Sequence, residues 1–188
     1  MTAVPSAEER ALELLRRCGA QGVAHPGGDL PAHLLRVRER LASWGARPAL
    51  RLAGLCHAVY GTDGFPVALL PLERRPEVVA AIGAEAEGVV YLYAACDRGA
   101  TYPGLGRAGS VFTDRFDGGR SLVPGERARR DFARLTAANE LDLAAEDPAF
   151  RAAYGPDLLV LLGRVRHLLG PGAREDCRAL ARDLGVRW

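Results

Sequence analysis

The chain has 188 residues, of which 48% are hydrophobic and 26% charged, and its formal net charge is +2. This length and apolar content predict one well-filled core, so we expect a single domain over residues 1–188. The charges are spread along the chain without a basic stripe, and nucleic acid is therefore excluded as an expected partner. No stretch of about 18 apolar residues could cross a bilayer, and the N-terminus lacks a signal-peptide pattern, so we expect a cytoplasmic protein without a membrane partner.

The first third of the chain predicts three helices. A capping box at residues 6–9, followed by apolar residues at helical spacing, predicts a helix over about 7–18. A turn-rich segment at 25–29 precedes an apolar stripe that predicts an amphipathic helix over about 31–43. The run over 49–60 is apolar on nearly every face and predicts a helix buried at the centre of the domain.

The remaining two thirds also predict helices, with one interruption. Residues 76–96 predict the longest helix, because apolar residues recur on one of its sides. Residues 97–125 are rich in Gly and Asp and predict a short hairpin or flap, our candidate for a lid. Further helices are predicted over about 126–145, 157–169 and 173–184, with Pro and Gly residues between them. The fold class we expect is an all-α bundle with a small irregular or hairpin insertion around 97–125.

Four cysteines stand far apart, at positions 18, 56, 96 and 177. None forms the C-x-x-C pair that is typical of zinc binding or thiol exchange. We therefore expect reduced thiols. Cys56 lies in an apolar run and is predicted to be a small core residue.

Two histidines occupy positions that should face the core. His57 lies in the buried helix, and His33 stands one turn before Val37 at the edge of its helix's apolar stripe. A lone buried histidine usually hydrogen-bonds a carbonyl group, whereas two on adjacent helices favour a shared functional pocket, and both interpretations stay open. His25, in the preceding loop, is either a surface turn residue, which we favour, or a third imidazole of that pocket.

The helix predicted over 126–145 carries polar residues where apolar ones are expected. Phe132, Leu135, Asn139 and Asp142 form one heptad-spaced stripe whose lower half is polar. Burying an unsatisfied polar group costs about 1–3 kcal/mol, so polar residues at these core-facing positions need an explanation. The stripe either caps a neighbouring backbone or lines a cavity.

Other polar residues are expected at the surface. His167 lies opposite the apolar face of its helix and should be solvated. An exposed position is also predicted for Arg127, Arg129, Arg130, Glu85 and Glu87.

In their order along the chain, these motifs resemble the HD superfamily of metal-dependent phosphohydrolases, most closely the small stringent-response alarmone hydrolases, over roughly residues 25–145. His33-Leu34-Leu35-Arg36-Val37 is similar to the segment that supplies the family's first metal ligand. The segment LAGLCHA at 52–58 is similar to the buried helix that ends in the family's His-Asp pair. The resemblance implies an HD-like helical fold.

The resemblance extends to two later elements. Residues 82–85 are similar to the start of the family's next helix, and Ala138-Asn139-Glu140-Leu141-Asp142 is similar to the helix that carries its last metal ligand. The chain also resembles an HD-like group that carries the motifs H-P-G and H-x-x-Y-G-T, here at residues 25–27 and 57–62.

The chain departs from the family's ligand pattern at its carboxylates. Ala58 stands where the Asp of the His-Asp pair is expected, and Asn139 stands at the place of the last Asp. Gly61 and Thr62 occupy the places of the acidic pair that alarmone hydrolases carry beyond the metal motif. A standard HD metal site and alarmone hydrolysis are therefore not expected.

Two kinds of chemistry remain open for the pocket. Hard ions such as Mn²⁺ favour oxygen ligands, but Zn²⁺ or Fe²⁺ accepts imidazoles, so His33 and His57 with His25 or Asp142 form a candidate metal set. Without a metal, a histidine still serves as a general acid or base near neutral pH. In that case catalysis is assigned to His33, His57, Tyr60, Thr62 and Asp63, and substrate binding to Arg36, Arg98 and Asn139.

We therefore expect a small-molecule enzyme on a degenerate HD-like scaffold. With a metal, it would hydrolyse a phosphoester; without one, it would be an acid–base isomerase, cyclase or lyase. The alternative is a non-catalytic module that binds a small effector on an inactivated HD fold. The apolar C-terminal helices could in addition form a homodimer face.

Overall fold

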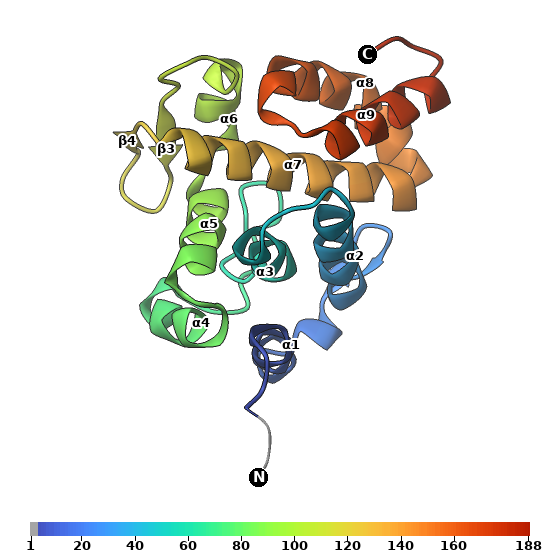
Figure 1. Cartoon of the computed structure of the whole chain (residues 1–188). Coiled ribbons are helices and arrows are strands. Elements are labelled where there is room, and N and C mark those ends of the chain that lie inside the picture. The colour runs from blue at the N-terminus through green and yellow to red at the C-terminus, as the bar shows by residue number, and fades with distance from the viewer. Residues whose placement is uncertain (1–3) are drawn as a thin grey trace.

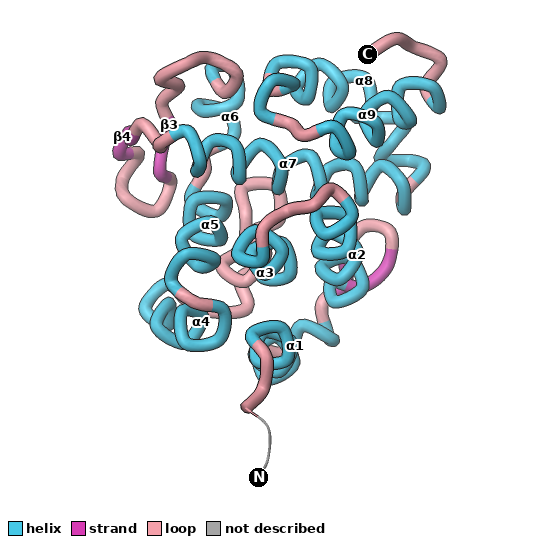
Figure 2. The backbone as a smooth tube through the Cα atoms, in the orientation of Figure 1, coloured by secondary structure: helices cyan, strands magenta, loops and turns pink. Residues whose placement is uncertain are grey.

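Helices make up most of the computed structural model, which describes residues 4–188 (Figure 2). The α-helices of this part are α1 (Ala7–Arg17), α2 (Leu30–Ser43), α3 (Pro48–Cys56), α4 (Arg75–Ile82), α5 (Ala84–Ala95), α6 (Arg98–Thr101), α7 (Glu126–Glu146), α8 (Pro148–Arg164) and α9 (Pro171–Asp183). The strands form two antiparallel pairs, β1 (Ala24–His25) with β2 (Gly28–Asp29) and β3 (Phe112–Asp114) with β4 (Arg120–Leu122). The prediction of an all-α bundle with a hairpin in the 97–125 segment is confirmed.

Helix α7 crosses the molecule and organises the other helices around it (Figure 1). Helices α8 and α9 lie on one side of α7, while α2, α3 and α5 lie on the other side. Helices α1 and α4 pack against each other at the end farthest from α8 and α9. The hairpin of β3 and β4 lies beside the N-terminal end of α7. Side chains that α2, α3 and α7 direct at one another therefore meet inside the bundle.

Local capping signals set the beginnings of several helices. The Ser6 hydroxyl accepts a hydrogen bond from the backbone N–H of Glu9, whose carboxylate accepts one from the N–H of Ser6, so the predicted capping box is confirmed. Asp29 caps α2 by accepting a hydrogen bond from the N–H of Ala32 at 2.8 Å. The position of His33 in the first turns of α2 follows from this cap.

Gly54 allows α3 to pack closely against α2. A Cβ atom at Gly54 would lie 2.5 Å from Cδ1 of Leu41, so the buried Leu41 side chain would have to shift to admit a larger residue. Both Leu41 and Cys56 are completely buried in the core, as predicted for Cys56. This close approach brings His57, which follows α3 directly, next to α2.

The prediction of one long helix over 76–96 is wrong. Gly83 interrupts it with a φ of +86°, so α4 ends at Ile82 and α5 begins at Ala84. A backbone in this left-handed region cannot continue an α-helix. Apolar residues recur at helical spacing on both sides of Gly83, so the sequence pattern does not indicate the break.

The prediction that Pro and Gly residues separate the helix over about 157–169 from the preceding one is wrong at Gly155 and Pro156. Pro156 lies inside α8, which begins at Pro148 and ends at Arg164. Proline removes one backbone hydrogen bond from a helix interior, but the buried Leu158, Leu159 and Leu162 of α8 pack into the core. Tertiary packing therefore outweighs the local breaking signal.

Two residues expected at the surface are buried. The Glu87 carboxylate accepts hydrogen bonds from the Tyr60 hydroxyl at 2.9 Å and from Arg75 at 2.6 and 2.9 Å, which compensates its burial. Arg129 is only 8% exposed and donates to the carbonyl of Arg107. The structure confirms exposed positions for His167, Arg127, Arg130 and Glu85.

Candidate functional site

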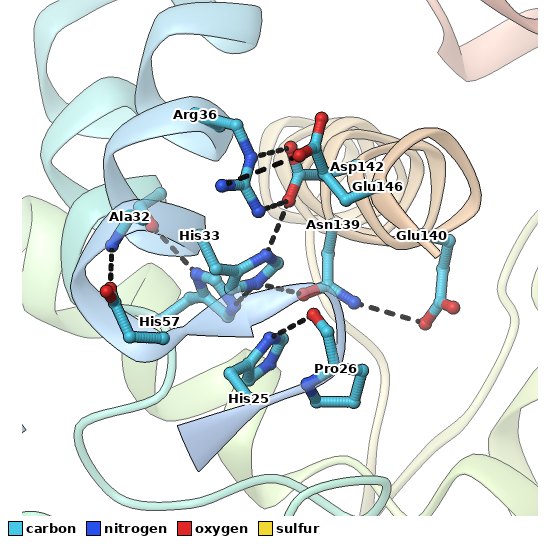
Figure 3. A network of polar contacts seen from close by, with 12 residues as sticks. His25, Pro26, Ala32, His33, Arg36, His57, Asn139, Glu140, Asp142 and Glu146 are labelled. Atoms are coloured by element: carbon cyan, nitrogen blue, oxygen red, sulfur yellow. Dashed lines mark hydrogen bonds and ion pairs between the residues drawn. The ribbon is translucent and has the colours of Figure 1, made fainter. Parts of the chain in front are cut away.

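His33 is completely buried on α2 and is held by a carboxylate of α7 (Figure 3). Its Nδ1 donates to Oδ2 of Asp142 at 2.7 Å. Arg36, one turn further along α2, donates to both oxygens of the same carboxylate at 2.9 and 3.0 Å. Burial acts to raise the pKa of Asp142, but the hydrogen bonds from His33 and Arg36 outweigh it and hold the pKa below its ordinary value. Asp142 is therefore an ionised acceptor that fixes the His33 ring.

His57 is 2% exposed and stands at the C-terminal end of α3. Its Nδ1 lies 2.7 Å from the carbonyl oxygen of Gly54, and since a carbonyl only accepts, Nδ1 carries the proton. Burial and the neighbouring His33 lower the pKa of His57 to about 3, so its imidazole is neutral near pH 7. The lone pair of His57 therefore lies on Nε2, which stands 3.4 Å from Nε2 of His33.

Asn139 on α7 approaches the same point with its amide oxygen. Its Nδ2 donates to Oε1 of Glu140 at 3.2 Å, and its Oδ1 lies 3.1 Å from Nε2 of His33. Glu140 also accepts a hydrogen bond from Arg98 at 3.1 Å. Because Nδ2 is directed at a carboxylate, the amide orientation follows from the network, and the oxygen faces the imidazoles.

Three acceptor atoms therefore converge in the interior (Figure 3). With the protons of His33 and His57 on their Nδ1 atoms, both Nε2 lone pairs and Oδ1 of Asn139 face one another without a hydrogen between them. Buried acceptors without a donor are costly. The arrangement calls for a cation at this point, either an added proton on His33 or a metal ion.

The donor set fits a borderline metal ion better than a hard one. Two neutral imidazoles and an amide oxygen suit Zn²⁺ or Fe²⁺, and two nitrogen ligands of a tetrahedral Zn²⁺ stand about 3.4 Å apart. Mn²⁺ and Mg²⁺ need carboxylates, but Ala58 supplies none and both oxygens of Asp142 are already bonded by Arg36 and His33. Between residues 4 and 188, no group of three or more His, Cys, Asp or Glu side chains could hold a metal ion. Any metal site here thus depends on the amide of Asn139.

His25 lies against the site, and not at the open surface as we favoured. Its ring stacks on that of His33, with centroids 4.0 Å apart, and its Nδ1 donates to the carbonyl of Pro26 at 3.2 Å. Burial, together with the nearby His33, lowers the pKa of His25 to about 4. His25 therefore covers one face of the His33 imidazole as a neutral ring.

A cavity of about 260 Å³ opens over this centre. His25, His57, Thr62, Arg98 and Asn139 are among the residues that line it. A small molecule in the cavity would reach His57 and Asn139 directly, while the fully buried His33 lies behind them.

The other candidate residues lie around the cavity or point away from it. Tyr60 donates to Glu87, and Asp63 accepts a hydrogen bond from the backbone N–H of Arg98 at 2.8 Å, so both side chains have structural partners. Arg36 is bound to Asp142 and not free for an anion. Glu140 also belongs to the site, although the sequence gives no signal for it beyond its position next to Asn139.

The all-α architecture is an HD-like helical fold, and the structural comparison agrees with this fold class. The structure is similar to a solved structure described as "A metazoan ortholog of SpoT hydrolyzes ppGpp and plays a role in starvation responses". The TM-score is 0.60 with 13% sequence identity, and the similarity covers 98% of this chain and 99% of the other. At this identity the match establishes the fold and not the reaction.

Sequence comparison adds one family. The model of a domain of unknown function, DUF6817, matches residues 14–98, which include His25, His33 and His57 but end before Asn139 and Asp142. No curated protein matches the chain. None of the helices described over residues 4–188 has the length and hydropathy needed to cross a membrane.

Proposed function

We propose that the protein is a small-molecule hydrolase whose reaction centre consists of His33, His57 and Asn139 with a borderline divalent ion such as Zn²⁺ or Fe²⁺. The observation that carries this proposal is the convergence of three lone-pair atoms, at 3.1 and 3.4 Å, beside an open cavity. When bound, such an ion lowers the pKa of a coordinated water and polarises the bond to be cleaved.

Partners on the side away from the centre hold the three ligands in place. Asp142 fixes the tautomer and ring orientation of His33, and the carbonyl of Gly54 does the same for His57. Glu140 holds the amide of Asn139 so that its oxygen, and not its NH₂ group, faces the centre. Removal of any of these partners should weaken metal binding without touching a ligand.

The charges near the centre favour a substrate of low charge. Arg36 is neutralised by Asp142, and Arg98 forms an ion pair with Glu140 at 3.1 Å. Neither arginine is free to neutralise a phosphate, so a polyphosphate would enter this cavity at a high electrostatic cost. We therefore favour a phosphodiester, which carries one negative charge, as the phosphoester that is hydrolysed.

The test is elemental analysis of protein purified without a metal-affinity tag, combined with hydrolysis of bis(4-nitrophenyl) phosphate. We expect near-stoichiometric Zn or Fe in the wild type and its loss, together with turnover, in His57→Gln. His167→Gln, at an exposed histidine, is the matched control and should keep both. Asn139→Asp adds a carboxylate and should tighten Mn²⁺ binding at least about tenfold. A wild type that binds neither metal and does not hydrolyse the diester with added Zn²⁺ or Fe²⁺ would overturn the proposal.

The second candidate is a metal-free acid–base enzyme, which the hydrogen bond between His33 and Asp142 favours. A carboxylate that orients an imidazole and stabilises its protonated form is a common arrangement in general acid–base catalysis. In this case an added proton on His33 takes the place of the metal ion, and the reaction is an isomerisation, cyclisation or elimination. Turnover that survives a chelator and is lost in Asp142→Asn would select this candidate. Ligand binding without turnover would instead indicate an effector-binding module.

A further inference from the structure

A second and larger cavity adjoins the one over the histidines. Its volume is about 480 Å³, within the range of cavities that hold a drug-sized molecule. The two cavities share four lining residues, Arg98, Glu140, Phe150 and Tyr154. The two cavities are therefore neighbours, with these side chains in the lining of both, and the larger one lies along α8.

Most of the residues that α8 contributes to this second cavity are apolar. Leu158, Leu161 and Val160 line it together with Tyr154. Tyr154 and Val160 are 57% and 56% exposed, so both leave apolar surface uncovered. An apolar body in the cavity would cover these side chains and gain the free energy of their burial.

The charged residues of the second cavity cancel one another. Arg98 and Glu140 form the ion pair that the two cavities share. The remaining charged residues that line the cavity are Asp157 and Arg164, one of each sign. The cavity therefore has no net formal charge, and an uncharged molecule fits it better than an ion.

Tyr102 combines a place in the cavity lining with a hydroxyl group that lacks a partner. It lines the cavity, and its buried hydroxyl has no hydrogen-bond partner among residues 4–188. A buried hydroxyl without a partner costs about 1–3 kcal/mol, which a ligand that hydrogen-bonds it would recover. The loop after Tyr102 packs closely against the end of α8, since a Cβ atom at Gly106 would overlap the backbone of Arg164.

We infer that the substrate carries an uncharged aromatic or branched apolar body, with an oxygen that hydrogen-bonds Tyr102, attached to the group that reacts at the histidines. The apolar body occupies the cavity along α8, and the reacting group reaches His57 and Asn139. The part of this inference that concerns the reacting group rests on the proposed function. The part that concerns the apolar body rests only on the residues that line the second cavity.

Binding of naphthalene and 1-naphthol, followed by their fluorescence, tests the inference without turnover. We expect saturable binding of one molecule per chain to the wild type. Val160→Glu should weaken binding of both probes at least about tenfold, because it places a charge in the apolar wall. Val123→Glu changes a comparably exposed valine that lines neither cavity and should leave binding unchanged. Tyr102→Phe should weaken 1-naphthol about two- to tenfold and leave naphthalene unaffected.

The outcomes separate this inference from the proposed function. Probe binding that Val160→Glu abolishes supports the apolar subsite, even if the protein holds no metal and hydrolyses no diester. A metal-containing, active enzyme that binds neither probe, or binds them equally well in Val160→Glu, overturns the subsite and leaves the hydrolase standing. Equal weakening by Val123→Glu would show non-specific binding and also overturn the inference.

Discussion

Asn139, His33 and His57 each owe their orientation to a partner on the side away from the site. The partners are Glu140, Asp142 and the carbonyl of Gly54. In each residue, the hydrogen bond to the outer partner fixes the position of a hydrogen and so turns a lone pair toward the common centre. The orientation of the three acceptor atoms is therefore set by hydrogen bonds that lie outside the centre. Small changes in these partners should therefore change the chemistry of the site more than its packing.

At the same scale, burial controls the reactivity of the thiols. It raises the pKa of Cys56 and Cys177 to about 12 and that of Cys96 to about 11, so all three are protonated near neutral pH. Only Cys18 is partly exposed, and burial raises its pKa as well. The thiolate is the reactive form, so native protein should react with Ellman's reagent at Cys18 alone, at a rate that still rises between about pH 7 and 9. Reaction of all four thiols in the native state would contradict this.

Among the helices, the contact between α2 and α3 matters most for the site, because it brings His33 and His57 together. Gly54 sits where α3 touches Leu41, and its carbonyl also holds His57. Gly88 on α5 is a contrasting glycine, since nothing lies within 4 Å of the place its Cβ would occupy. The two glycines therefore differ in packing while both lie within helices.

We expect opposite effects from alanine at these two glycines. Gly54→Ala should lower the free energy of unfolding by about 1–3 kcal/mol through overpacking against α2. Gly88→Ala should raise it by about 0.5–1 kcal/mol, because alanine favours the helix and meets no neighbour. Urea unfolding followed by circular dichroism measures both. Stabilisation by Gly54→Ala would show that α2 and α3 do not pack as described.

Buried apolar side chains connect the whole described molecule, from Ala11 on α1 to Ala181 on α9, in one continuous cluster. Helix α7 lies at its centre and contacts α2, α3 and α5 on one side and α8 and α9 on the other. In such a core, unfolding of one half of the molecule would expose the buried apolar side chains of the other half to water. We therefore propose that residues 1–188 form one domain.

A single cooperative unfolding transition is the expected result of this architecture. Trp44 donates to Asp176 at the contact of α2 with α9, and Trp188 donates to the carbonyl of Leu159 on α8, so the two report from different places. The variants Trp44→Phe and Trp188→Phe each leave one fluorescent reporter. Both should give the same urea midpoint as far-UV circular dichroism, after correction for each variant's own stability. Separate midpoints would indicate two domains.

The helices themselves follow from signals that lie close together in the sequence. The capping box at Ser6 and Glu9, the Asp29 cap and the apolar stripes act over one or two helical turns, and they predicted α1, α2 and α7 well. The same patterns placed His33 and His57 in the interior. Local hydrogen bonds and hydrophobic periodicity need no knowledge of distant residues.

Partners from distant parts of the chain decided the rest. Asp142 meets His33 across 109 residues, and Arg98 meets Glu140 across 42. Glu87 is buried because Tyr60 and Arg75 supply donors to it, although its own segment resembles a surface helix. The free energy of burying a polar group depends on the partner it finds, and that partner is known only once the helices have packed together.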